Sequence, residues 1–88
     1  MDDELRIFLA RSKLRIIALQ EMAEGPQIAS FLAKKLKKHR EAISRVFLDL
    51  QAKKLAKCQN PKDPHFRQYT TTEKGKLVLQ ELRQLGYL

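Results

Sequence analysis

The chain has 88 residues, of which 43% are hydrophobic and 32% are charged, and its formal net charge is +8. This length predicts one small domain with a single core, and the hydrophobic content excludes a mainly disordered chain. The sequence opens on acidic residues instead of the basic start of a secretory signal, and no apolar run approaches the roughly 18 residues of a membrane span. We therefore expect a cytoplasmic protein with no membrane segment.

The apolar residues of the first quarter of the chain follow mostly helical spacing, which Ser12 interrupts. We expect an N-terminal segment over residues 1–12 and a helix from Lys13 to Ala23 that begins at a Ser12 cap. The Gly25-Pro26 pair ends this helix.

Residues 27–53 are predicted to form a helix-turn-helix. Its first helix runs from Gln27 to Lys35, with an inner face of Ile28, Phe31 and Leu32 at i, i+3, i+4 spacing. A basic turn from Leu36 to His39 leads to a second helix from about Arg40 to Lys53, whose start has no Ser, Thr, Asp or Asn cap. The buried stripe expected on the second helix is Ile43, Val46, Phe47 and Leu50.

Two short extended segments, Leu55–Gln59 and Phe66–Thr71, flank a run of turn-forming residues, which predicts a two-stranded wing over residues 55–71. A C-terminal helix over 72–88 opens at Thr72, or at Thr70, which with Glu73 has the spacing of a capping box. The predicted class is α+β, mainly α. It is a winged helix-turn-helix with a three-helix core, a two-stranded β wing and a C-terminal helix, in one domain over residues 1–88.

The excess charge lies in one stretch, from Lys34 to Arg67. This stretch holds eleven Lys and Arg residues against three acidic ones, whereas the remaining residues hold seven of each sign. A one-sided cluster on the two elements that can enter a groove of DNA indicates a polyanionic partner. The sequence therefore predicts binding to double-stranded DNA.

On a helical wheel, Arg45 and Glu41 point away from the buried stripe, and Ser44 lies on its shoulder. An arginine in that place can donate two hydrogen bonds to guanine in the major groove. Cations crowd the turn at the positive end of the second helix, where a phosphate would be favoured, and basic wing residues can reach the flanking backbone or minor groove. The predicted DNA-binding residues are Lys37, Lys38, His39, Arg40, Glu41, Ser44, Arg45, Lys62, His65 and Arg67.

Catalysis and metal binding are not expected. The soft ligands Cys58, His39 and His65 lack the paired short spacing of a zinc site, and the three glycines are too scattered for a phosphate-binding loop. A free cysteine next to Ala56 on a strand is typical of a small buried residue. The prediction is no enzyme activity, no catalytic residue, no metal and no cofactor.

The run from Phe31 to Lys76 resembles the core of archaeal winged helix-turn-helix transcription regulators, akin to the ArsR and MarR groups. The matching segments are Ile28-Ala29, Leu32-Ala33, Ile43-Ser44-Arg45-Val46, Leu50 to Leu55, Asn60-Pro61, Arg67-Gln68-Tyr69 and Thr72-Glu73-Lys74-Gly75. The resemblance implies a sequence-specific dimer on duplex DNA, with residues 40–53 in the major groove and the wing beside them.

This chain departs from that family at two positions. Lys54 stands where a helix-ending glycine is usual, and Leu48 stands where a polar or basic residue is common. The Cys and His clusters of metal-sensing ArsR members are also missing, and no long apolar pocket for a MarR-like ligand is evident. We therefore expect no small-molecule effector.

Apolar residues near both termini exceed what a small three-helix core can cover, which favours a homodimer. The predicted interface is Leu5, Phe8, Leu9, Leu79, Leu82 and Leu85, and the alternative is that both terminal segments fold back onto their own domain. Two other functions stay open. One is an RNA-binding winged helix, which is disfavoured because the few aromatic residues stand mostly at core-like positions. The other is a protein-interaction module using Leu48 and the final Gly86-Tyr87-Leu88.

Overall fold

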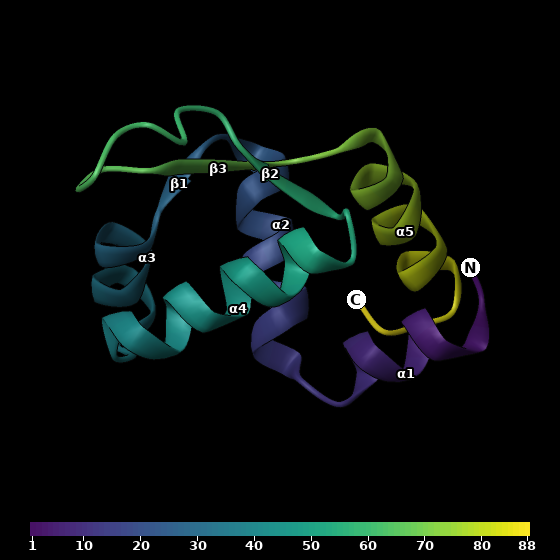
Figure 1. Cartoon of the computed structure of the whole chain (residues 1–88). Coiled ribbons are helices and arrows are strands. Elements are labelled where there is room, and N and C mark those ends of the chain that lie inside the picture. The colour runs from purple at the N-terminus through teal and green to yellow at the C-terminus, as the bar shows by residue number, and fades with distance from the viewer.

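The computed structural model describes all 88 residues, and its elements form a helix-turn-helix followed by a hairpin and a last helix (Figure 1). In chain order these are α1 (Asp3–Ala10), α2 (Lys13–Glu24), β1 (Gln27–Ile28), α3 (Ala29–Leu36), α4 (Arg40–Ala52), β2 (Ala56–Cys58), β3 (Gln68–Thr71) and α5 (Glu73–Gln84). This is the predicted winged-helix class. None of the helices has both the length and the apolar character needed to cross a membrane.

The first two helices begin at side-chain caps. The carboxylate of Asp2 accepts a hydrogen bond from the Leu5 amide at 2.7 Å, so the predicted N-terminal segment is largely helical. Ser12 caps α2 as predicted, with its Oγ accepting from the Arg15 amide at 3.3 Å. Both caps satisfy amides that have no carbonyl partner within the first helical turn.

The sheet has three strands and not two. Gln27 and Ile28, predicted as the first turn of a helix, have an extended backbone and pair with β3, opposite Tyr69 and Gln68. The strand order is β1-β3-β2, with all pairs antiparallel. Helix α3 therefore begins two residues later than the sequence suggested, because hydrogen bonding to β3 holds this segment extended.

The inner face of α3 also differs from the prediction. Leu32 is buried, but Phe31 is 60% exposed to solvent. Once the helix begins at Ala29, its inner stripe runs through Leu32 and Ala33 to Leu36, which turns Phe31 outward. An aromatic side chain expected in the core is thus on the surface.

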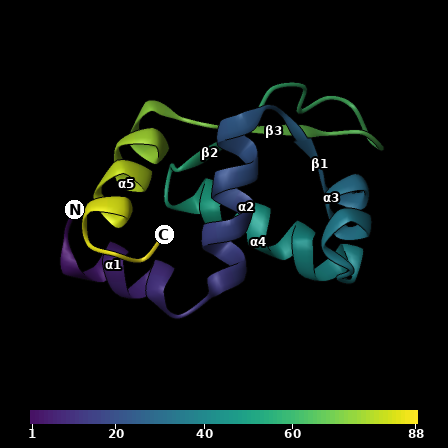
Figure 2. The ribbon, with the colours of Figure 1, turned by 180° about the vertical axis from the view of Figure 1, so that it is seen from behind.

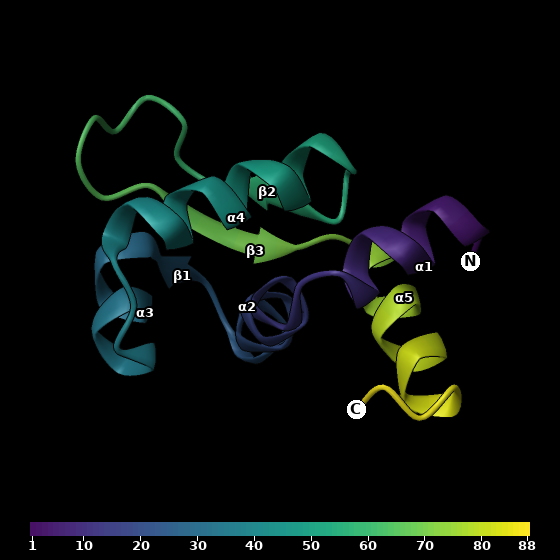
Figure 3. The same ribbon diagram turned by 90° about the horizontal axis from the view of Figure 1, so that it is seen from below.

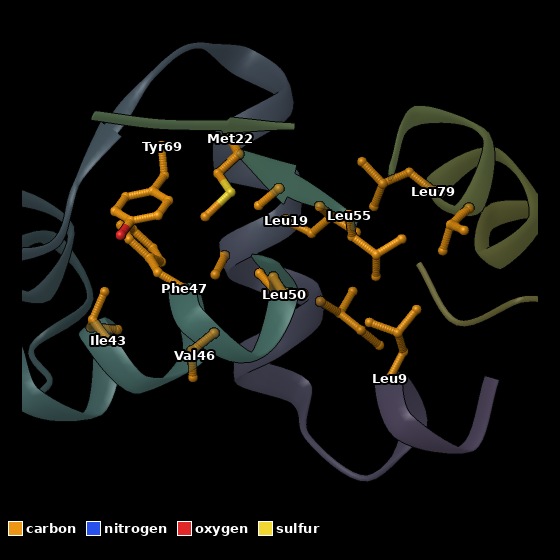
Figure 4. Close-up of a cluster of buried hydrophobic side chains, with 14 of the residues drawn as sticks. Leu9, Leu19, Met22, Ile43, Val46, Phe47, Leu50, Leu55, Tyr69 and Leu79 are labelled. Carbon is orange, nitrogen blue, oxygen red and sulfur yellow. The ribbon is translucent and has the colours of Figure 1, made fainter. Parts of the chain in front are cut away.

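Helix α4 lies across the core, and its stripe of Ile43, Val46, Phe47 and Leu50 is buried as predicted (Figure 4). The ring of Phe47 packs against that of Tyr69 from β3, with centroids 5.1 Å apart and planes tilted by 53°. An aromatic pair in this tilted geometry contributes about 0.5–1.5 kcal/mol beyond the buried area. Because α4 is fixed to the sheet on one face, its opposite face is left free for a partner.

Two lysines end the helices of the helix-turn-helix in the left-handed conformation, Lys37 with φ 57° and Lys54 with φ 62°. After each, an amide donates a hydrogen bond to the carbonyl five residues earlier, Lys38 to Ala33 and Leu55 to Leu50, both at 2.9 Å. Glycine is the usual residue at such positions because it has no Cβ to clash. Lys54, which follows the C-cap residue Lys53, therefore takes the left-handed position after α4 at a cost in backbone strain.

Helix α5 begins at Thr72, whose Oγ1 accepts a hydrogen bond from the Gly75 amide at 3.1 Å. The alternative capping box does not form, since Thr70 lies inside β3 opposite Lys57. Gly75 is buried against the hairpin, and a Cβ added to it would lie 2.5 Å from the Leu55 carbonyl oxygen. The absence of a side chain at this position is what lets α5 approach the sheet.

Both terminal segments fold back onto the domain. Four of the six residues predicted for a dimer interface, namely Leu5, Leu9, Leu79 and Leu82, lie in the chain's own core. Phe8 is half-buried, with the Arg15 guanidinium 3.9 Å from its ring centroid, and only Leu85 is exposed. Figure 2 shows α1 and α5 together at the end of the molecule that carries both termini.

Candidate nucleic-acid interface

The basic stretch keeps most of its charge free of internal partners. Lys35 and Lys53 form ion pairs with Glu21 and Glu4, at 2.8 and 3.3 Å. The other nine cations of the stretch are exposed and have no ion pair: Lys34, Lys37, Lys38, Arg40, Arg45, Lys54, Lys57, Lys62 and Arg67. A surface with so many uncompensated cations attracts a polyanion.

The free face of α4 carries the side chains that the helical wheel placed there. Glu41 and Arg45 are both exposed, and Leu48 is 56% exposed. Helix α4 begins at His39 with no side-chain hydrogen bond to its first amides, as the sequence indicated. The exposed face and the uncapped start both lie open to a partner.

A pocket of about 270 Å³ lies between α4, the start of α3 and the wing loop, which we define as residues 59–67. Figure 3 shows α4 and the wing loop on the same side of the molecule. The residues that line the pocket are Ile28, Ala29 and Ser30, then Arg40, Ser44, Phe47 and Leu48, and finally Pro64, His65, Arg67 and Tyr69. None of them carries a carboxylate, so Arg40 and Arg67 give the lining a positive charge, and hydrophobic side chains such as Phe47 and Leu48 form part of it.

Three side chains of the wing loop hydrogen-bond to the backbone around them: Asp63, Asn60 and Arg67, whose Nε donates to the Asp63 carbonyl at 3.1 Å. One carboxylate oxygen of Asp63 accepts hydrogen bonds from the amides of His65 and Phe66, both at 2.9 Å. The Asn60 amide group donates to the Phe66 carbonyl at 2.9 Å, and its oxygen accepts from the Gln68 amide at 2.7 Å. The amides of Phe66 and then His65 hold the pKa of Asp63 below its ordinary range, because they bind its charged form.

The structure divides the predicted DNA-binding residues into four groups. Arg40, Ser44, His65 and Arg67 meet around the pocket. Glu41 and Arg45 lie on the outer face of α4, whereas Lys62 lies in the wing loop. The turn before α4 carries Lys37, Lys38 and His39, all exposed. In Figure 1, α3, the start of α4 and the wing loop share one end of the molecule, opposite both termini.

Several residues of this surface were not predicted. Phe66 is 53% exposed in the wing loop, and its ring faces that of Phe31 with centroids 6.4 Å apart. Ser30 and Pro64 line the pocket beside them. The spacing of Ala29, Leu32, Ala33 and Leu36 could have shown that Phe31 points outward, but no periodic signal exists for a residue in an irregular loop. The aromatic residues are thus less confined to the core than the sequence suggested.

No group of three or more His, Cys, Asp or Glu side chains is arranged to hold a metal ion. Cys58 is half-buried on β2, with its sulfur 3.8 Å from the Asn60 side-chain oxygen. A partly covered position on a strand agrees with the small packing role predicted for this cysteine.

No protein-family model matches the sequence, and no curated protein matches it. Two solved structures do, both of ZitR from Lactococcus lactis in a double mutant in which a cysteine and a histidine are replaced by alanine. One has a TM-score of 0.73 and 24% identity, covering 83% of this chain and 51% of ZitR. The other, an apo form, has a TM-score of 0.73 and 22% identity, covering 91% of this chain and 61% of ZitR. The chain thus spans half to three-fifths of the chains it matches, and it has their winged-helix fold.

Proposed function

We propose that this protein is a transcription regulator that binds double-stranded DNA, with α4 in the major groove and the wing loop on the flanking backbone or minor groove. The single observation that carries the proposal is the set of nine exposed cations without ion-pair partners on α3, the following turn, α4 and the wing. DNA phosphates would neutralise this surface, and the release of counterions from the DNA would favour binding. The proposed role is binding and not catalysis.

The geometry of α4 supports a contact with base edges. The major groove, about 12 Å wide, admits a helix, and the face of α4 opposite its buried stripe is free to enter it. On that face Arg45 can donate two hydrogen bonds to one guanine, and Glu41 can accept from a cytosine amino group. These two residues are the proposed source of sequence specificity.

The wing and the turn have the chemistry of phosphate contacts. Lys62 and Arg67 extend from a loop whose shape is fixed by Asn60 and Asp63, so they would meet the backbone with little ordering cost. Lys37 and Lys38 stand next to the uncapped start of α4, whose amides favour an anion. Such contacts orient the protein on the duplex without reading its sequence.

The resemblance to archaeal ArsR- and MarR-type regulators supports the same role. The fold alone does not assign it, because winged helices also serve RNA binding and protein contacts. The exposed Phe31 and Phe66 give an RNA-binding winged helix more support than the sequence did, and it remains the second candidate.

We also propose a homodimer, but its contact surface differs from the one expected from the sequence. Most of the residues first expected there are covered by the chain's own core, but Ile7, Leu77, Leu85, Tyr87 and Leu88 stay exposed on α1, α5 and the C-terminal segment. These elements lie at the end of the molecule that carries both termini (Figure 1). The opposite end, formed by α3, the start of α4 and the wing loop, is called the basic end here. A second copy could therefore pack on α1 and α5 without repulsion between the two DNA-binding surfaces. Two copies would then read a palindromic site with half-sites about 34 Å apart.

Sedimentation with and without Leu85→Asp tests the dimer. We expect wild type at micromolar concentration to sediment as two chains and the variant to sediment as one. A wild-type mass of one chain would exclude the dimer, and a dimer that tolerates Leu85→Asp together with Leu88→Asp would place the interface elsewhere.

Titrations with duplex DNA, single-stranded DNA and structured RNA at several salt concentrations test the main proposal. We expect duplex binding to weaken steeply with salt, since each neutralised phosphate contributes a slope of about 0.9 in log affinity against log salt. Preferential binding of structured RNA would favour the second candidate. Absence of binding to any nucleic acid would favour a protein-interaction module.

A further inference from the structure

Two phenylalanine rings from separate elements meet on the surface at the basic end of the molecule. Phe31 of α3 is 60% exposed and Phe66 of the wing loop is 53% exposed, although their centroids are only 6.4 Å apart. Neither ring lines the pocket itself, but their neighbours in the chain do, namely Ser30 before Phe31, and His65 and Arg67 on either side of Phe66. The exposed pair therefore lies near the pocket.

The wing loop presents Phe66 in a fixed backbone conformation. The Phe66 amide donates to the Asp63 carboxylate, and the Phe66 carbonyl accepts from the Asn60 side chain, both at 2.9 Å. Neither bond depends on the ring, so the loop would keep its shape with any side chain at this position. A rigid aromatic that contacts a partner loses little conformational entropy on binding.

The charges that line the neighbouring pocket indicate the chemistry of that partner. Arg40, His65 and Arg67 line the pocket, and no carboxylate does. The partner must therefore offer a flat apolar face joined to negative charge. A nucleobase on its phosphate chain has both properties, and aromatic side chains beside cations are the usual way in which proteins hold unpaired bases.

We propose that Phe31 and Phe66 form a stacking platform for an unpaired base of DNA, with Arg40 and Arg67 on its phosphates. The inference rests on the proposed function, which brings DNA to this end of the molecule, and goes beyond it. In a fully paired duplex each base is already stacked on both faces, so a second aromatic surface has no free face to cover. The protein should therefore bind DNA that contains unpaired bases, in addition to reading duplex through α4.

A comparison of two single strands separates stacking from phosphate binding. We would measure the affinity for a short oligo-dT and for an abasic strand of the same length, at one salt concentration. The two strands carry the same phosphates, so a purely electrostatic surface binds them equally. The platform predicts that oligo-dT binds about tenfold more tightly, because its bases can stack on the aromatic side chains whereas the abasic strand has no base to stack.

Three variants test which side chains cause the difference in affinity between oligo-dT and the abasic strand. Phe66→Leu and Phe31→Leu keep an apolar side chain and all backbone hydrogen bonds, and each should bring the ratio of the two affinities close to one. Phe8→Leu removes an aromatic side chain of α1, away from the phenylalanine pair, and should leave the ratio unchanged. A ratio that survives both phenylalanine substitutions overturns the location, and equal binding of the two strands by wild type overturns the platform. A much higher affinity for oligo-rU than for oligo-dT overturns the assignment to DNA.

The two proposals fail in different ways. If duplex binding is strong and salt-dependent while oligo-dT and the abasic strand bind equally, the platform is wrong and the duplex proposal stands. If oligo-dT binds through the phenylalanines but duplex does not bind, the platform stands and the duplex proposal is wrong. A duplex with one unpaired thymine should bind more tightly than its fully paired parent, and Phe66→Leu should abolish that gain.

Discussion

The hydroxyl of Thr72 donates a hydrogen bond to the carbonyl of Lys54 at 2.8 Å, and the same oxygen accepts one from the Gly75 amide at 3.1 Å. One side chain thus ties the end of α4 to the start of α5. The hairpin lies between these two residues in the sequence, so the contact closes the base of the wing. The orientation of the wing relative to α4 depends on this junction.

Thr72→Ala should lower the free energy of unfolding by about 1–2 kcal/mol, because it removes the cap of α5 and leaves the Lys54 carbonyl without this donor. Urea denaturation measures the loss. Thr72→Ser keeps the hydroxyl and should recover most of the stability, whereas Thr70→Ala should have a smaller effect. An equal loss for Thr70→Ala would contradict the assignment of the cap to Thr72.

Lys54→Gly should raise the free energy of unfolding by about 1 kcal/mol, since glycine adopts the left-handed conformation at φ 62° without strain. Lys54→Ala removes the same charge but keeps a Cβ, so it should give no such gain. Thermal unfolding of the two variants side by side isolates the backbone contribution. A glycine variant no more stable than the alanine variant would show that the strain is negligible.

Acid should loosen the wing loop. The folded pKa of Asp63 lies below its ordinary value because its carboxylate accepts two amide hydrogen bonds, from Phe66 and His65. The stabilisation is therefore present above the pKa of the unfolded chain and is lost as the pH falls through the lowered folded pKa. The protection of the His65 and Phe66 amides against hydrogen exchange, measured by nuclear magnetic resonance relative to the intrinsic exchange rate at each pH, should fall in that range. A Phe66 amide resonance that titrates at or above the ordinary aspartate pKa would contradict this hydrogen bonding.

Arg45→Ala should cost about 1–3 kcal/mol at a specific duplex site and much less on random DNA, as expected of a base-edge contact. Lys62→Ala should weaken both kinds of binding about equally, because a phosphate contact carries no sequence information. Competition binding with a selected site and random duplex measures both ratios. If Arg45→Ala lowers both affinities by the same factor, Arg45 contacts phosphate and specificity comes from Glu41, Ser44 or the turn.

The sequence was most informative where it carried a helix cap or a regular apolar spacing. Ser12 marked the start of α2, and the spacing of Ile43, Val46, Phe47 and Leu50 gave both the buried face of α4 and the exposure of Arg45. When one face of a helix is buried, the positions of the residues on the opposite, exposed face follow from the helical repeat. The outward part of the candidate site was therefore predictable from α4 alone.

What the sequence could not supply depends on contacts between distant residues. Gln27 and Ile28 look like the start of a helix, and only pairing with Tyr69 and Gln68 makes them a strand. The outward orientation of Phe31 follows from local spacing, but its contact with Phe66 crosses an irregular loop and no local spacing encodes it. The pocket between α4 and the wing has the same origin.

The salt dependence of duplex binding, measured for two variants of equal charge, tests the central claim most directly. One variant combines Lys38→Ala, Arg45→Ala and Lys62→Ala at the basic end, and the other combines Arg11→Ala, Lys13→Ala and Arg83→Ala, exposed cations on other parts of the surface. We predict a steep slope of log affinity against log salt for wild type, a slope smaller by about 1.8 for the first variant, in which Lys38 and Lys62 are the proposed phosphate contacts, and no change for the second. A flat wild-type response, or an equal reduction in both variants, would contradict the assignment of this surface to DNA.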